Sequence, residues 1–130
     1  MKQIMNTIID TDRRGRMDYS KILLTIIIFL FNNVLIWYQL NGQLVWKFWT
    51  TPKGIVLSLL MGIPITALFW LATKWGYIGF GNLWAVRFMG FATSMMTFPI
   101  MTYLYLGEPM TTKVIVTIML AVVIMIVQVL

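Results

Sequence analysis

A few polar side chains interrupt a largely apolar chain, and they are the candidates for chemistry. Glu108 is the only acidic residue after Asp18. Arg87 lies near the start of one apolar block, and Asn32 and Asn33 lie near the middle of another. In a lipid environment such groups cost free energy, and by default they mark ion, proton or substrate sites. The elements around them must show which groups bind a ligand and which hold helices together.

The composition indicates a protein whose solvent is lipid. Of the 130 residues, 60% are hydrophobic and 11% are charged, whereas soluble domains contain about 45–50% apolar and about 25% charged residues. A soluble protein of this length cannot bury so much apolar surface in one core. The chain contains no cysteine and no histidine. Disulfides, thiol chemistry and the usual zinc and haem ligands are therefore excluded.

The basic residues indicate membrane topology rather than nucleic-acid binding. The net charge is +6, but the lysines and arginines stand at the ends of apolar blocks, which suits anionic lipid headgroups. Residues 1–21 hold five of the ten basic residues. We expect them to form a charged cytoplasmic arm, either partly amphipathic on the membrane surface or disordered. The positive-inside rule then places both termini in the cytoplasm, and we expect a bacterial-type plasma membrane.

Four apolar segments are long enough to cross a bilayer, which takes about 20 residues per helix. They lack the alternation of barrel strands, and helices satisfy their own backbone hydrogen bonds in lipid. The sequence therefore predicts an all-α integral membrane protein with one four-helix domain at residues 22–130 and short loops. The predicted spans are residues 22–40, 54–73, 83–106 and 109–130.

The first predicted span carries amides and an indole that could line a cavity. Asn33 and Trp37 are four residues apart, so they share one face of a helix. The amide would form hydrogen bonds with a substrate, and the indole would stack on it or bind a cation. The alternative is that Asn32 and Asn33 only tie this helix to its neighbours.

The third predicted span is the richest in polar residues. Trp84 and Arg87 share a face, and Thr97 and Tyr103 follow further along. Arg87 either holds an anionic group or extends to the lipid headgroups. Proline residues predict kinks in the second and third spans, which alternating access could use. Our predicted substrate-binding residues are Asn33, Trp37, Trp84, Arg87, Thr97 and Tyr103, and the predicted kinks lie at Pro64 and Pro99.

The stretch Gly107–Glu108–Pro109 predicts a structural turn rather than a proton site. Gly107 is placed to end the third helix in a left-handed conformation, and Pro109 suits the first turn of the fourth. Glu108 would then lie at the positive end of the fourth helix dipole. Replacing this carboxylate would affect stability more than substrate preference.

The chain end, with Leu106, Gly107 and Glu108 followed by a last aliphatic helix, resembles the drug/metabolite transporter superfamily. In that superfamily an aliphatic-Gly-Glu turn commonly closes the penultimate helix. The four-helix length is similar to its small multidrug resistance members, which work as dimers, often antiparallel. Those members carry an essential glutamate in the first helix, whereas this chain has Asn32 and Asn33 there. The resemblance therefore implies a small dimeric transporter without that branch's cation/proton exchange.

These observations predict a small membrane transporter for a polar or neutral metabolite, acting as a dimer in the lipid bilayer. The alternative is a non-transporting accessory subunit of a larger membrane complex, because the spans carry few charges and the last is almost purely aliphatic. No phosphate-binding loop, metal-ligand spacing or nucleophile with a base occurs. We therefore expect no enzyme activity, no cofactor, no metal and no nucleic-acid partner.

Overall fold

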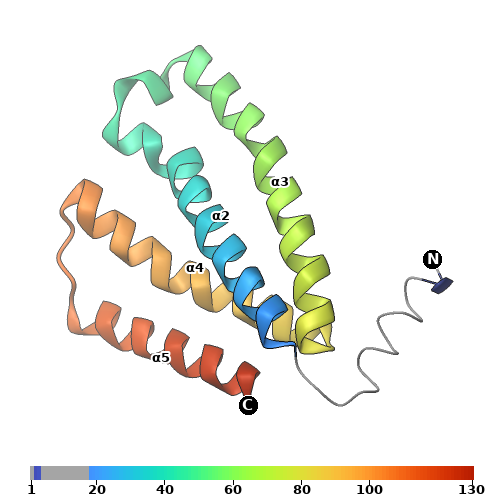
Figure 1. The fold of residues 1–130 in the computed structure, drawn as a ribbon. Helices are drawn as coiled ribbons and strands as arrows, with labels where there is room; N and C mark the ends of the chain where they lie inside the picture. Colours follow the sequence, from blue (N-terminus) through green and yellow to red (C-terminus); the bar gives the residue numbers. More distant parts are fainter. Residues whose placement is uncertain (1, 4–17) are drawn as a thin grey trace.

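The fold is all-helical, as predicted (Figure 1). The computed structural model describes residues 2–3 and 18–130, so most of the predicted arm lies outside the described residues. Helices α2 and α3 form an antiparallel hairpin, α4 lies beside α2, and α5 packs mainly on α4. A short 3-10 helix, η1, connects α2 to α3. The elements are α2 (Tyr19–Val45), η1 (Lys47–Thr50), α3 (Pro52–Phe80), α4 (Leu83–Leu106) and α5 (Thr112–Val129).

Three of these helices, α2, α3 and α5, are long and apolar enough to cross a membrane. By length and composition the chain is therefore an integral membrane protein. Helix α4 spans residues 83–106 as predicted, but it is not among the three. Arg87 and several threonine, proline and tyrosine residues lower its hydropathy.

The helices of the first hairpin are longer than the predicted spans. Asp18, assigned above to the arm, caps α2, because its Oδ1 atom accepts hydrogen bonds from the backbone N–H groups of Ser20 and Lys21 at 3.1 and 3.3 Å. Helix α3 does not end near residue 73 but continues to Phe80, which leaves a two-residue connection to α4. Glycine inside α3 permits close packing there: a Cβ atom on Gly76 would lie 3.0 Å from side-chain atoms of both Thr25 and Val86.

The connection between α4 and α5 differs from the prediction. Gly107 ends α4 with φ of 67°, which confirms the left-handed conformation. Helix α5, however, begins at Thr112, because Thr111 caps it by accepting a hydrogen bond from Val114 N–H. Pro109 is therefore not in the first turn of α5, and Glu108 does not lie at that helix terminus. The prediction of a dipole-stabilised Glu108 was wrong, and residues 107–111 form a longer connection.

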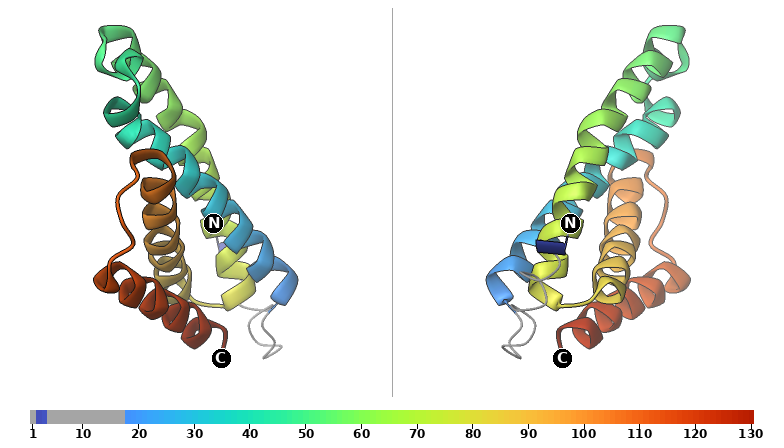
Figure 2. Two further views of the ribbon diagram at one scale, coloured as in Figure 1. Left: turned by 90° about the vertical axis from the view of Figure 1, so that its left-hand side faces the viewer. Right: turned by 90° about the vertical axis from the view of Figure 1, so that its right-hand side faces the viewer.

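The buried apolar core lies where the N-terminal ends of α2 and α4 meet the C-terminal end of α3. Met125 and Val129, in the C-terminal part of α5, pack against it. Figure 2 shows α5 running obliquely across α4 to return to this end of the bundle. The core consists of Ile22, Phe29, Ala72, Phe80, Ala85, Val86 and Met89.

Candidate functional site

Two hydrogen bonds between side chains fix the polar face of α2 against α4. Asn33 Nδ2 donates to Thr93 Oγ1 at 3.1 Å. One turn further along, Trp37 Nε1 donates to Thr102 Oγ1, also at 3.1 Å. All four side chains are buried, so each bond satisfies polar atoms that would otherwise stay unpaired in a low-dielectric interior. The alignment of α2 with α4 is therefore set by polar contacts as well as by packing.

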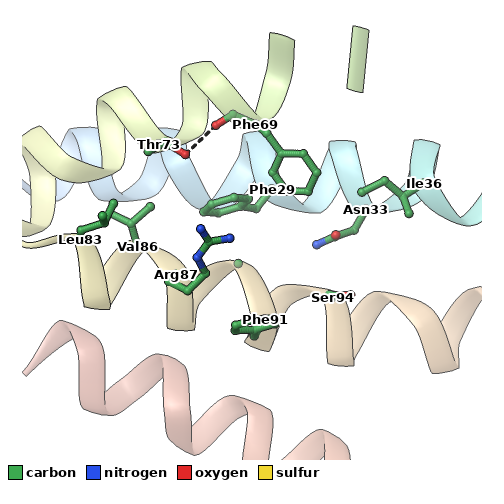
Figure 3. Close-up of a pocket in the computed structure, with 11 residues that line it drawn as sticks. Phe29, Asn33, Ile36, Phe69, Thr73, Leu83, Val86, Arg87, Phe91 and Ser94 are labelled. Carbon is green, nitrogen blue, oxygen red and sulfur yellow. Dashed lines mark hydrogen bonds between the residues drawn. The ribbon is translucent and has the colours of Figure 1, made fainter. Parts of the chain in front are cut away.

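A cleft opens beside this polar face, between the α2–α3 hairpin and α4 (Figure 3). Its volume is about 220 Å³, enough for a small organic molecule. Its lining comes from three helices: Phe29, Asn33 and Ile36 of α2, Phe69 and Thr73 of α3, and Leu83, Val86, Arg87, Gly90, Phe91 and Ser94 of α4.

Arg87 is the only charged residue among the described residues of this lining. Figure 3 shows its guanidinium group pointing away from α4, toward Phe29 and the α3 side of the cleft. It makes no hydrogen bond or ion pair with the residues that the structure describes. Thr73, across the cleft, donates its hydroxyl to Phe69 O of its own helix at 2.8 Å. Arg87 therefore retains its full set of donors for a ligand.

The rest of the cleft combines aromatic walls with a second polar end. Phe29 and Phe69 meet edge to face, with ring centroids 6.2 Å apart. Asn33 and Ser94 lie at the opposite end from Leu83 in Figure 3. The described part of the lining contains no carboxylate, imidazole or thiol, and no three His, Cys, Asp or Glu side chains among the described residues could share a metal ion. The cleft therefore presents three kinds of binding group: a guanidinium, an amide and aromatic rings.

A cluster of aromatic side chains packs around Trp37. The Trp37 and Tyr105 rings stack with centroids 5.1 Å apart, and the hydroxyl groups of Tyr38 and Tyr105 share a hydrogen bond. Trp46 packs on both tyrosines. A smaller cavity of about 30 Å³ next to Trp37 shares Asn33 and Ser94 with the cleft. The polar face of α2 thus continues from the cleft toward this aromatic cluster.

The structure brings some of the predicted binding residues together and separates others. Asn33 and Arg87 line the cleft, and Trp37 lines the adjoining cavity. Thr97 is buried but donates its hydroxyl to Thr93 O of its own helix at 2.8 Å. Trp84 is 73% exposed and stacks on Phe88, and Tyr103 is 50% exposed. These last two side chains lie outside the cleft lining.

Sequence reasoning missed the aromatic walls, Phe29, Phe69 and Phe91, and the role of Ser94. Helical spacing could have identified Phe91 and Ser94. They follow Arg87 at spacings of four and then three residues, so the three side chains lie on one face of a helix. The pairing of Phe29 with Phe69 needs the register of α2 against α3, which one sequence does not provide.

Asn32 is the least satisfied polar residue of the interior. It is fully buried, and neither its Nδ2 nor its Oδ1 atom has a hydrogen-bond partner within the described part of the chain. Its neighbour Asn33 is paired with Thr93. The two adjacent amides therefore make opposite contributions to stability, since an unpaired buried amide costs about 1–3 kcal/mol.

Comparisons with known proteins give no assignment. No family model matches the chain, and no curated protein and no solved structure shows significant similarity to it.

Proposed function

We propose that this chain is a small membrane transporter that binds a polar metabolite in the cleft between α2, α3 and α4. The observation that carries the proposal is the cleft itself, which combines the free guanidinium of Arg87, the amide of Asn33 and aromatic walls. Polar groups are expensive inside a membrane and are concentrated at substrate pathways. Ligand sites are typically concave and largely apolar, with a few polar groups that fix orientation.

In this proposal α4 is the fourth membrane crossing. Its 24 residues span about 36 Å, enough for the hydrocarbon core. Arg87 lies four residues from the start of α4, about 6 Å along the axis, so its charge stays near the edge of the hydrocarbon. Both termini lie on the cytoplasmic side of the plasma membrane. A second copy completes a dimer, as in the small multidrug resistance proteins, which the chain resembles in its four-helix length.

The test is ligand-dependent stabilisation followed by transport. Purified protein is screened against a metabolite panel by intrinsic tryptophan fluorescence, and compounds that raise the melting temperature are assayed for uptake into proteoliposomes. We expect a stabilising compound to be taken up, and Asn33→Leu to weaken both effects. Val122→Leu in α5, outside the cleft, serves as the matched control. If no compound stabilises the protein and none is taken up, transport is refuted.

A second candidate function is an accessory subunit of a larger membrane complex. It is favoured by the apolar surface of α5, whose one buried residue in the described chain is Ala121, and which leaves large side chains such as Met119 and Leu120 exposed. Such a surface fits another membrane helix as well as it fits lipid. Co-purification from native membranes of one partner at fixed stoichiometry, together with no uptake by the chain alone, would favour this function.

A further inference from the structure

We infer that the cleft selects an amphiphilic organic anion, with a carboxylate or phosphate on Arg87 and an apolar body between the phenylalanine rings. This inference rests on the proposed function and names the substrate class of the same site. The two proposals can fail separately. If only the anion preference is wrong, the chain is still a transporter of neutral solutes; if the cleft binds no metabolite at all, both proposals are wrong.

The first step concerns the charge of Arg87. A guanidinium presents five N–H donors in a planar fork, which matches the oxygens of a carboxylate or phosphate. Here the fork points into the cleft and has no partner in the described part of the chain. Bidentate ion pairs of this kind are stronger than neutral hydrogen bonds.

The second step is that no carboxylate among the described residues forms an ion pair with Arg87. Asp18 caps α2, and Glu108 lines a separate groove at the other end of α4, with Pro99 and Thr102. Two lysines lie at the same end of the bundle as the start of α4. Lys21 Nζ lies 4.0 Å from the centroid of the Trp75 ring, and Lys74 Nζ lies 5.4 Å from it. Against the one carboxylate of Asp18 at this end, the described residues place three cations, Lys21, Lys74 and Arg87. This excess of positive charge favours anions over cations.

The third step concerns the walls. Exposure increases outward from Phe29, which is 4% exposed, through Phe69 at 40% to Phe91 at 58%. An apolar body placed there gains by leaving water, in proportion to the apolar area that it buries. At the far end Asn33 and Ser94 can accept or donate one further hydrogen bond. A small anion without an apolar body would leave these rings unused, and a neutral solute would leave the guanidinium unpaired.

The same chemistry is available from two sources. One is a soluble organic acid or organic phosphate, and the other is the headgroup and upper chain of an anionic phospholipid that enters between the helices. The volume of about 220 Å³ suits an aromatic acid of modest size. 3-Phenylpropionate and its neutral analogue 3-phenylpropanamide are therefore a matched pair of soluble probes. Phosphatidylglycerol and phosphatidylcholine provide the matched pair of lipids.

The experiment measures the melting temperature of the full chain in uncharged detergent with each soluble probe, and in nanodiscs of phosphatidylcholine with and without phosphatidylglycerol. Wild type is compared with Arg87→Gln, with Arg87→Lys, and with Lys113→Gln, which removes a charge outside the cleft. We expect the acid to raise the melting temperature of wild type and Lys113→Gln, and the amide to have little effect. Arg87→Gln should weaken the apparent affinity for the acid about ten- to hundredfold, and Arg87→Lys by less.

The outcomes are distinct. Equal stabilisation by acid and amide would overturn the anion preference and leave the transport proposal standing. Stabilisation by phosphatidylglycerol alone, abolished by Arg87→Gln, would uphold the anion site with a lipid as occupant and count against transport of a soluble metabolite. An equal loss in Lys113→Gln and Arg87→Gln would mean that only overall charge matters, which overturns the site. No response to any probe would overturn the anion site, and the metabolite panel alone would then decide on transport. If Arg87→Gln does not fold, the comparison of acid with amide on wild type still tests the anion preference.

Discussion

The two helical hairpins of the chain are held together in different ways. The α2–α3 hairpin is bonded near both ends: Asp18 N–H donates to Gly79 O at 3.1 Å, and Gln39 and Ser58 exchange side-chain-to-backbone hydrogen bonds at 2.8 and 3.3 Å. Between α4 and α5 the described residues form no hydrogen bond. These two helices are joined by residues 107–111 and by apolar packing.

The difference shows that similar apolarity does not give helices similar roles. In lipid, apolar side chains gain little by moving from lipid to another helix, so close packing and hydrogen bonds decide which helices are held firmly. By this criterion α2–α3 is a fixed frame, and α5 is the least anchored helix. Helix α4, which borders the cleft, is held to this frame by the hydrogen bonds from Asn33 and Trp37, so we expect α5 to be the helix that moves most.

The strongest test of the fixed frame is Gly54→Ala at the start of α3. A Cβ atom there would lie 2.3 Å from Phe48 O and 2.5 Å from Trp49 Cα, and backbone atoms cannot move aside as a flexible side chain can. We expect a loss of about 3 kcal/mol, at the upper end for overpacking, or failure to fold. The measurement is the free energy of unfolding, or the melting temperature, from tryptophan fluorescence.

Gly62→Ala in the same helix is the matched control for Gly54→Ala. The nearest atom to its Cβ would be Gln39 Nε2 at 3.6 Å, an ordinary contact, and alanine is favoured over glycine in a helix by about 0.5–1 kcal/mol. We expect no loss of stability. Equal effects of the two variants would contradict the view that the α2–α3 hairpin is closely fitted.

The second prediction concerns the link between the frame and α4. Asn33→Leu removes the hydrogen bond to Thr93 and should lower the free energy of unfolding by about 0.6–2 kcal/mol, the range for hydrogen bonds between membrane helices. Asn32→Leu removes an amide that has no partner among the described residues and should leave stability unchanged or raise it. Unfolding followed by tryptophan fluorescence compares the free energies of the two variants. A loss on Asn32→Leu as large as on Asn33→Leu would mean that Asn32 has a partner in another conformation.

The sequence alone predicted much of the fold, for physical reasons that are visible in particular residues. Long apolar runs locate helices, and Gly107 was placed correctly because few residues other than glycine tolerate its φ. The start of α5 was missed because both Pro109 and Thr111 can begin a helix, and a single sequence does not rank them.

Of the site residues, Asn33 and Arg87 were identified from the sequence because they are polar groups in apolar surroundings. Trp84 was placed beside Arg87 by its spacing of three residues, but the helix rotation turns it outward, with 73% exposure.

The last predicted loss of stability lies in the connection of the second hairpin. Gly107→Ala places a Cβ atom in open space, with nothing described within 4 Å, but at φ of 67°. The cost is therefore only backbone strain of about 1 kcal/mol, without a clash of the kind expected at Gly54. Gly107→Asn should cost less, because asparagine tolerates the left-handed region better than alanine.

The melting temperatures should fall in the order wild type, Gly107→Asn, Gly107→Ala. Ligand affinity should stay constant, because this connection lies outside the cleft lining. If Gly107→Ala weakened ligand binding more than it lowered stability, the α4–α5 connection would itself control the shape of the cleft, and the contrast between the fixed frame and the loosely anchored α5 would need to include it.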